Sequence, residues 1–199
     1  MVFRTNLPDT ASVAISRGDE RLFAPSAERN SKPIINLIKR IAPKSGEALE
    51  IASGTGQHIT KLALALPNLS WLPSEVEEKR LKSITAWIQN ENLQNIKSPL
   101  YLDATASGWA KNIPRYDFIL LVNLLHLISW NETKTLICEL SKALKTKGVA
   151  LIYGPFMRNG QLTSEGDQNF HTSLIQTDPD IGYKNDSDMR KLFFNEGLL

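Results

Sequence analysis

The chain has 199 residues, of which 42% are hydrophobic and 22% are charged, an ordinary globular composition that argues against disorder. The formal net charge of +2 is too small to indicate nucleic acid, and basic residues are scattered among acidic ones. The length suits one domain with a substantial core.

Signals for disulfides, metals and membranes are absent from the sequence. The single cysteine, Cys138, cannot form an internal disulfide, and no Cys/His cluster with metal-ligand spacing accompanies it. Residues 1–20 lack the continuous apolar stretch of a signal peptide, and no run of about 18 apolar residues could cross a membrane. We therefore expect a cytoplasmic protein with no membrane contact and no metal.

The first elements alternate between helix and strand. Residues 1–20 predict an irregular arm, and residues 21–199 a single domain. Apolar residues at helical spacing after Asn30 predict a helix with Ser31 as its N-cap. The apolar run 48–52 is too short for a helix and enters a glycine turn, which is typical of a buried strand. Helical spacing then resumes from Ile59 to Leu66.

The alternation continues to the end of the chain. Two capping boxes, Ser74 with Glu77 and Ser129 with Glu132, predict the starts of two further helices. Such alternation predicts one doubly wound α/β sheet, Rossmann-like, with about five parallel strands. The remaining strands are expected at 69–72, 99–103, 118–122 and 149–153, and the remaining helices at about 167–175 and 187–195.

The turn after the first strand favours a ligand without phosphate. Gly54 and Gly56 let the backbone approach a ligand closely, and the helix that follows offers free N–H groups. The dinucleotide fingerprint requires a third glycine where this chain has Ile59, and no Gly-Lys-Ser/Thr of a P-loop follows. The remaining pattern, acid-x-x-x-Gly-x-Gly, is that of strands that bind S-adenosylmethionine (SAM).

Three acidic residues stand at the ends of successive strands. Glu50 is expected near the ammonium group of SAM, Glu75 at the two ribose hydroxyls, and Asp103 at the adenine amine. Each acid alone is an ordinary turn or helix-start residue, whereas their order beside the glycines favours one cofactor site.

Further residues are expected at the same site. Arg29 could clasp the SAM carboxylate bidentately, unless it belongs to a solvated helix start. Gln57 and His58 begin the helix after the turn, where His58 could equally be a neighbour of the helix cap. The expected cofactor site also includes Ala52, Thr55, Ala104 and Asn123.

Two long motifs resemble a known family. They are EIASGTGQH (50–58) and RLFAPSAERN (21–30), supported by WLPSE (71–75), NLLH (123–126) and YGPF (153–156). The chain resembles the methyltransferase-like 26 family, small class I methyltransferases that are also described as a domain of unknown function. The resemblance implies a class I SAM-dependent methyltransferase fold, SAM as cofactor and S-adenosylhomocysteine as product.

The resemblance is incomplete in two respects. Glu75 stands where the family usually has Asp, which keeps the chemistry with a longer reach. Class I methyltransferases also end in an antiparallel hairpin, which this sequence lacks. We therefore expect strand 149–153 to be an edge that is shielded by the segment 154–182 or associates with a second copy.

The methyl acceptor is expected beyond the central strand. His126 is the best placed general base if the acceptor must lose a proton, although it could instead pack at a strand end. Tyr153 and Phe156 are expected to line the acceptor pocket. The predicted activity is methyl transfer to an unidentified small molecule or protein; the alternatives are a catalytically silent SAM-binding or protein-interaction module, and an oxidoreductase, which Ile59 disfavours.

Overall fold

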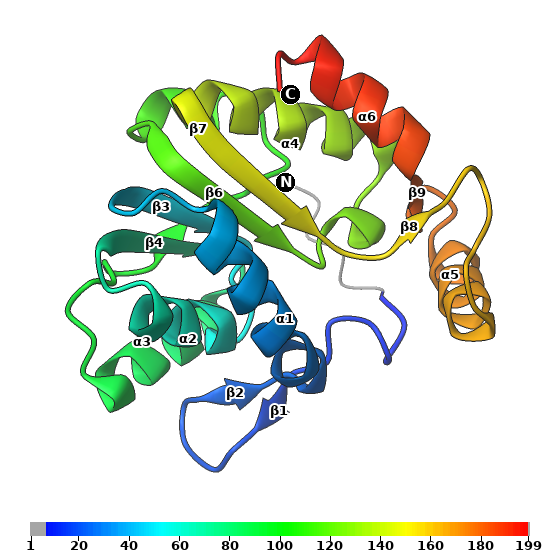
Figure 1. Cartoon of the computed structure of the whole chain (residues 1–199). Helices are drawn as coiled ribbons and strands as arrows, with labels where there is room; N and C mark the ends of the chain where they lie inside the picture. The colour runs from blue at the N-terminus through cyan, green and yellow to red at the C-terminus, as the bar shows by residue number, and fades with distance from the viewer. Residues whose placement is uncertain (1–6, 199) are drawn as a thin grey trace.

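A computed structural model describes residues 7–198 of the chain. Its centre is a five-stranded parallel sheet in the order β5-β4-β3-β6-β7 (Figure 1). The prediction of a doubly wound α/β sheet with five parallel strands is confirmed. The strands are β3 (Gly46–Ile51), β4 (Leu69–Glu75), β5 (Leu100–Tyr101), β6 (Tyr116–Val122) and β7 (Leu144–Tyr153).

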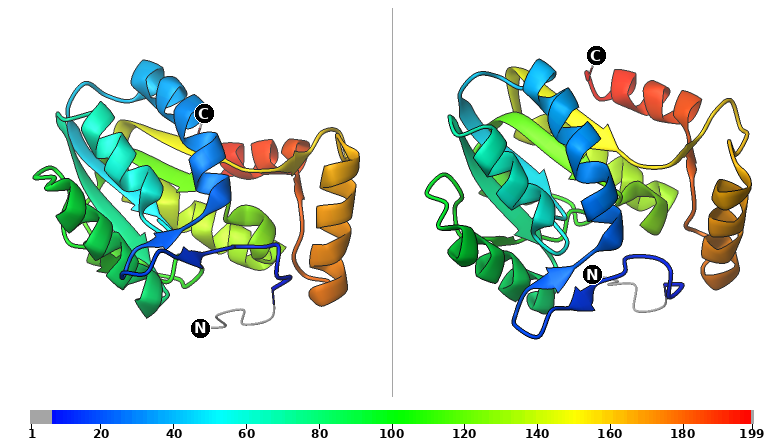
Figure 2. Two further views of the ribbon diagram at one scale, coloured as in Figure 1. Left: turned by 90° about the horizontal axis from the view of Figure 1, so that it is seen from below. Right: turned by 60° about the horizontal axis from the view of Figure 1, so that its bottom comes forward.

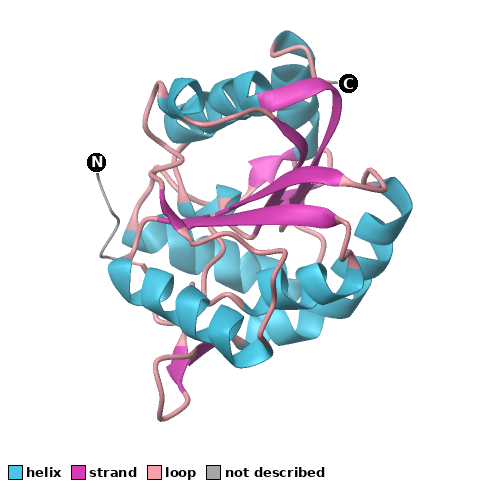
Figure 3. Cartoon of the chain, turned by 90° about the vertical axis from the view of Figure 1, so that its left-hand side faces the viewer, coloured by secondary structure: helices cyan, strands magenta, loops and turns pink. Residues whose placement is uncertain are grey.

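Helices cover both faces of the sheet, as Figures 1 and 3 show. On one face α1 (Pro25–Ile41), α2 (Gln57–Ala65) and α3 (Glu78–Glu91) pack over a core that contains Trp71 and Phe118. On the other face the short helix η1 (Trp109–Asn112), α4 (Trp130–Ala143) and α6 (Asp186–Asn195) enclose a second core. Because both faces are covered, the central strands read as nearly continuous apolar runs.

Strand β6 shows this burial most clearly. Phe118 and Leu120 enter the first core, whereas Ile119 and Leu121 enter the second, and all four are at most 1% exposed. The ring of Phe118 meets that of Trp71 edge to face at 6.0 Å, which links β6 to β4 across β3.

The segment after β7 forms a small unit beyond the carboxyl end of the sheet. It comprises β8 (Phe156–Met157), α5 (Glu165–Thr177) and β9 (Lys184–Asn185), and β8 pairs with β9 in parallel. Figures 1 and 2 show α5 past the arrowhead of β7 and not along its edge. The expectation that residues 154–182 shield this edge is therefore wrong.

The N-terminal residues are only partly irregular. Strand β1 (Ile15–Ser16) lies within the expected arm and pairs antiparallel with β2 (Leu22–Phe23). Trp87 fixes this hairpin to α3, because its Nε1 donates to the carbonyl of Leu22 at 3.0 Å. The guanidinium groups of Arg17 and Arg21 lie over the Trp87 ring at 5.6 and 5.1 Å.

Two predicted helix starts are wrong. Helix α1 begins at Pro25, so Ser31 lies inside it and its hydroxyl donates to the carbonyl of Ala27. Pro25 at the first helical position and Glu28 in the first turn were the correct start signals. The predicted box at Ser74 also fails, because β4 continues through Ser74, whose hydroxyl donates to the carbonyl of Glu50.

The capping box at Ser129 is confirmed. Its hydroxyl accepts from the backbone N–H of Glu132 at 3.2 Å, while the Glu132 carboxylate accepts from the N–H of Ser129 at 2.7 Å. Between residues 7 and 198, no helix is both long and apolar enough to span a membrane.

Candidate functional site

A large pocket opens at the carboxyl edge of the sheet, where ligands bind in doubly wound folds. Its volume is about 860 Å³, within the usual range for small-molecule sites. The structure brings ten of the predicted site residues to its wall: Arg29, Ala52, Gly54, Thr55, His58, Glu75, Asp103, Ala104, Asn123 and His126.

Three predicted cofactor residues do not line the pocket. Glu50, Gly56 and Gln57 lie behind its wall, where Glu50 is 1% and Gln57 is 2% exposed. These three residues pack behind the residues that line the pocket, and direct contact with a ligand stays a prediction for all three.

The glycine turn and Glu75 are joined directly. The carboxylate of Glu75 accepts from the N–H of Gly54 at 2.9 Å and from the N–H of Val76 at 2.8 Å. Burial raises the pKa of Glu75, while the bond from Val76 and the nearby charge of Arg80 oppose that rise. The end of β4 therefore carries a buried acceptor group that faces the same cavity as the turn.

Glu50 is a buried carboxyl group whose pKa is strongly raised. Its Oε2 has no hydrogen-bond partner among the described residues, and complete burial raises the pKa of its carboxyl to about 8. The nearby Glu75 carboxylate adds to the rise. At neutral pH the Glu50 side chain is therefore largely protonated in this structure.

Gly56 is required by packing. Its φ of +94° lies in the left-handed region, and a Cβ there would come within 2.9 Å of the Ile84 Cα on α3. The expected close approach of a ligand to Gly56 stays a prediction, because Gly56 lies behind the pocket wall. The glycine lets α3 approach the start of α2.

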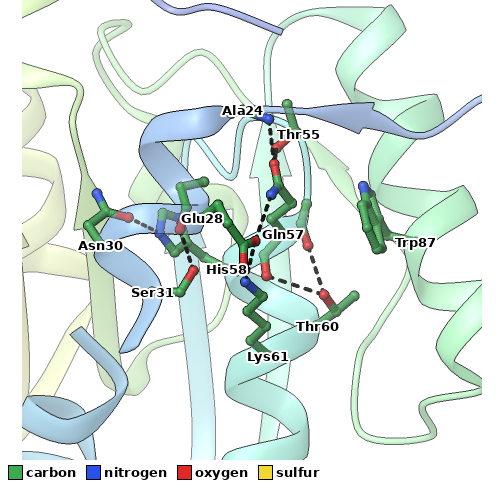
Figure 4. Close-up of polar contacts among 12 residues, drawn as sticks. Ala24, Glu28, Asn30, Ser31, Thr55, Gln57, His58, Thr60, Lys61 and Trp87 are labelled. Atoms are coloured by element: carbon green, nitrogen blue, oxygen red, sulfur yellow. Dashed lines mark hydrogen bonds and ion pairs between the residues drawn. The ribbon is translucent and has the colours of Figure 1, made fainter. Parts of the chain in front are cut away.

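Gln57 links the start of α2 to the start of α1 (Figure 4). Its side-chain oxygen accepts from the N–H of Ala24 at 2.5 Å and from the hydroxyl of Thr55 at 3.0 Å. Its amide nitrogen donates to Glu28, which also pairs with Lys61 at 2.6 Å. These bonds hold the glycine turn against α1.

His58 makes a second link between the same helices (Figure 4). Its Nε2 lies 2.7 Å from the side-chain oxygen of Asn30. Burial lowers the pKa of His58 to about 4, so the ring is neutral at pH 7. The two motifs that carry the family resemblance, residues 21–30 and 50–58, are thus in direct contact.

Arg29 and Asp103 present charge at the pocket. Arg29 is exposed on α1, and its guanidinium has no hydrogen bond or ion pair to another described residue, which leaves it able to bind an anionic ligand group. One carboxylate oxygen of Asp103 accepts from the N–H and the hydroxyl of Thr105, at 3.0 and 2.6 Å. Asp103 therefore forms a turn and also lines the pocket.

Asn123 and His126 follow β6. Asn123 has a φ of +56°, and its N–H donates to the carbonyl of Tyr153 at 2.8 Å. His126 lies in the short helix η2 (Leu125–Leu127) and is 6% exposed. Of the expected acceptor residues, Tyr153 and Phe156 do not line the pocket, whereas Pro155 between them does. The aromatic pair therefore does not form the acceptor wall.

Sequence patterns missed three contributors to the pocket. Residues 7–14 line it, although they belong to the expected irregular arm. Arg80 lines it and donates to the backbone carbonyl and the hydroxyl of Ser12, at 2.8 and 2.7 Å. Phe170 reaches it from α5. No local pattern marks these residues, because long-range packing brings them to the site.

Comparisons with known proteins agree with this geometry. A family model described as a protein of unknown function (DUF938) matches residues 21–199. An O-methyltransferase family protein from Burkholderia thailandensis superimposes with a TM-score of 0.74 at 15% identity, covering 87% of this chain and 52% of that one.

Two other solved structures give the same fold. A putative O-methyltransferase from Nostoc punctiforme has a TM-score of 0.75 at 18% identity, with 87% of this chain and 51% of that one covered. Human N-acetylserotonin methyltransferase, solved in complex with SAM, has a TM-score of 0.69 at 12% identity, with 86% and 47% covered. The chain spans about half the length of these proteins. At these identities the likeness establishes the class I methyltransferase fold alone.

Proposed function

Because the chain belongs to the DUF938 family of unknown function and has the class I methyltransferase fold, we propose that it is a SAM-dependent methyltransferase. The observation that carries the proposal is the direct bond between the glycine turn and Glu75 at the wall of one pocket. The motifs of residues 21–30 and 50–58 further support membership of the methyltransferase-like 26 group within this fold.

The wall residues match the parts of SAM. We place the ribose hydroxyls at Glu75, the adenine amine at Asp103 and the carboxylate at Arg29, with Ala52, Thr55, Ala104 and Asn123 around them. A neutral His58 adds no charge beside the ammonium group. Glu50 would act from behind the turn, where its Oε2 has no hydrogen-bond partner among the described residues.

For methyl transfer from SAM, the main task of the protein would be to position the cofactor and the acceptor. When bound, SAM would supply a methyl group on a positively charged sulfur. A lone pair of the acceptor would attack in line as the sulfur–methyl bond breaks, and a neutral O–H or N–H acceptor would release its proton to water. S-adenosylhomocysteine is then the product. Since charge is dispersed in this displacement, holding the two reactants in line accounts for much of the rate acceleration.

Calorimetry with S-adenosylhomocysteine tests the cofactor site through Glu75→Gln. A charged acceptor that binds paired donors contributes about 1.5–3 kcal/mol, so the variant should bind roughly ten- to a hundredfold more weakly. Glu78→Gln is the matched control, because Glu78 is exposed on α3 and pairs with Lys82 outside the pocket. Equal dissociation constants for Glu75→Gln and the unaltered protein would show that the ribose is misplaced.

Turnover separates the enzyme from a silent module. Incubation with methyl-labelled SAM and a cell extract should transfer label if the protein is an active methyltransferase. Tight binding of S-adenosylhomocysteine without any transfer would favour the catalytically silent module of the same fold.

A further inference from the structure

The part of the pocket that lies away from the glycine turn is more apolar than the part beside the turn. We define this distal half by Leu7, Leu124, His126, Leu127, Pro155 and Phe170, all of which line the pocket. Leu7, Leu127 and Phe170 pack against a third core, formed by Ala11, Leu174, Ile181 and Tyr183. The N-terminal segment, η2 and the unit around α5 therefore meet here and build a largely apolar wall.

Among the six residues that define the distal half, His126 has the one polar side chain. Its ring is wedged edge to face against Phe170 at 5.5 Å and against Tyr183 at 6.2 Å, which fixes its plane. Nδ1 is enclosed and has no hydrogen-bond partner among the described residues. Nε2 is the nitrogen that remains to meet the cavity lined by the ring.

The position of the ring proton follows from this enclosure. Burial, with a smaller contribution from the charge of Lys184, lowers the pKa of His126 to about 4, so the ring is neutral and carries one proton. A buried N–H without an acceptor is costlier than a buried lone pair without a donor. The proton therefore resides on Nε2, and His126 presents a hydrogen-bond donor to the cavity.

Charge at the distal half disfavours an anionic ligand. The two arginines of the pocket lie toward the glycine turn. Nη1 of Arg80 is 3.5 Å from the position that a Cβ on Gly54 would take. Arg29 precedes Asn30, whose side chain contacts His58 at the start of α2. Two acidic residues also line the pocket: Asp9, two residues after Leu7, and Glu132, whose carboxylate accepts from the N–H of Ser129 just after η2. Lys184 lies behind the wall, and its ammonium group donates to the carbonyls of Ile128 and Gly182.

The N-terminal segment also limits the size of the ligand. Residues 7–14 line the pocket and are held by Leu7 and Ala11 at the third core and by the two bonds from Arg80 to Ser12. A macromolecular acceptor would have to displace this segment, whereas a small molecule fits beneath it.

We propose that the distal half binds the methyl acceptor, and that the acceptor is a small, uncharged, largely apolar molecule whose oxygen accepts a hydrogen bond from Nε2 of His126. This inference rests on the proposed methyltransferase function. It makes His126 a residue that orients the acceptor, in place of the general base that its position after the central strand suggested.

Three matched probes test the ligand class: 4-ethylphenol, the anion 4-ethylbenzoate and ethylbenzene. Each is titrated into the full chain, with and without saturating S-adenosylhomocysteine, and its dissociation constant is obtained from the NMR signals of the probe itself, a readout that also serves variants without the His126 ring. A neutral hydrogen bond contributes about 0.5–1.5 kcal/mol, so 4-ethylphenol should bind about two- to tenfold more tightly than ethylbenzene. The anion should bind more weakly than the phenol. Preference for the anion, or equal binding of phenol and hydrocarbon, would overturn the proposal.

Two substitutions test the donor. His126→Gln offers an amide N–H near the place of Nε2 but cannot act as a base at neutral pH, so it should retain most of the preference for the phenol. His126→Leu keeps the apolar packing and should abolish that preference. Loss of the preference in both variants, with unchanged folding by circular dichroism, would contradict donation from Nε2.

The tautomer can be observed without any ligand. In protein labelled with ¹⁵N-histidine, long-range proton–nitrogen spectra at pH 7 should show the His126 proton on Nε2, and a proton on Nδ1 would refute the argument. Calorimetry with S-adenosylhomocysteine separates the two proposals. If S-adenosylhomocysteine binds but the His126 proton is on Nδ1, or the phenol is not preferred, only the inference about the acceptor is contradicted. If S-adenosylhomocysteine does not bind, the proposed function is contradicted.

Discussion

At the scale of single residues, the acidic groups at the sheet edge perform different physical tasks that the sequence cannot distinguish. The pattern of strands and glycines located Glu50, Glu75 and Asp103 correctly at successive strand ends. Their environments depend on neighbours far along the chain. Glu75 bonds Gly54, whereas Glu50 is sealed behind the turn without a partner for Oε2. Burial of this kind is a tertiary property that spacing does not encode.

The protonation of Glu50 gives a prediction about stability. Its folded-state pKa of about 8 exceeds the ordinary value of 4.5, so folding favours the protonated form. Its contribution to stability is therefore complete below pH 4.5 and is lost as the pH rises toward 8, by about 1.4 kcal/mol per pH unit within that window. Glu50→Gln removes this dependence and should be more stable than the unaltered protein at pH 8.

Urea unfolding at pH 5 and pH 8 measures the difference between the two proteins. Because the two proteins share every other titratable group, the comparison isolates Glu50 together with its coupling to Glu75. Glu78→Gln, exposed on α3, is the control and should follow the unaltered protein at both pH values. If Glu50→Gln loses stability with pH as steeply as the unaltered protein, the Glu50 carboxyl is ionised when folded.

At the scale of elements, junctions between helices and strands were harder to predict than the elements themselves. The expected helix start at Ser31 omitted the first six residues of α1, from Pro25 to Asn30. Those residues bring Glu28 and Asn30 to α2, where they contact Gln57 and His58. Apolar periodicity finds the buried face of a helix, but this first turn is polar because it binds another element.

The contact of the glycine turn with α3 gives a prediction at this scale. In Gly56→Ala the new residue must adopt a positive φ, and its Cβ would lie 2.9 Å from the Cα of Ile84. Gly54→Ala also requires a positive φ, of +61° against +94° at Gly56, but its Cβ meets only the flexible end of Arg80, at 3.5 Å. The left-handed conformation costs each variant about 1–2 kcal/mol, and Gly56→Ala should lose more because α3 must shift.

Urea unfolding of both variants at one pH gives their free energies of unfolding. Cofactor affinity should fall in Gly56→Ala together with stability, since the turn moves with α3. Equal destabilisation by the two substitutions would show that α3 does not press on Gly56.

At the scale of the whole molecule, the sequence predicted the sheet but not what surrounds its last strand. Alternating elements are local signals, and they located all five parallel strands. The placement of α5, β8 and β9 beyond the carboxyl end depends on the third core, whose members come from residues as distant as Ala11 and Tyr183. Between residues 7 and 198, no strand pairs with the outer side of β7.

The open side of β7 gives the last prediction. The carbonyl of Tyr153 accepts from Asn123 on the β6 side, and backbone groups alternate along a strand, so those of Ala150 and Ile152 point outward. Residues 149–152 are half-buried and uncharged, which favours pairing with another chain. We propose that two copies associate through this edge.

Ala150→Pro removes an outward N–H without touching the bonds to β6, and it should reduce self-association while the fold persists. Val149→Pro is the contrasting variant, because it removes an N–H that faces β6 and should destabilise the sheet. Light scattering at rising protein concentration compares the Ala150→Pro variant with the unaltered chain. If the unaltered chain remains monomeric throughout, or if Ala150→Pro associates equally well, β7 does not mediate contact between copies.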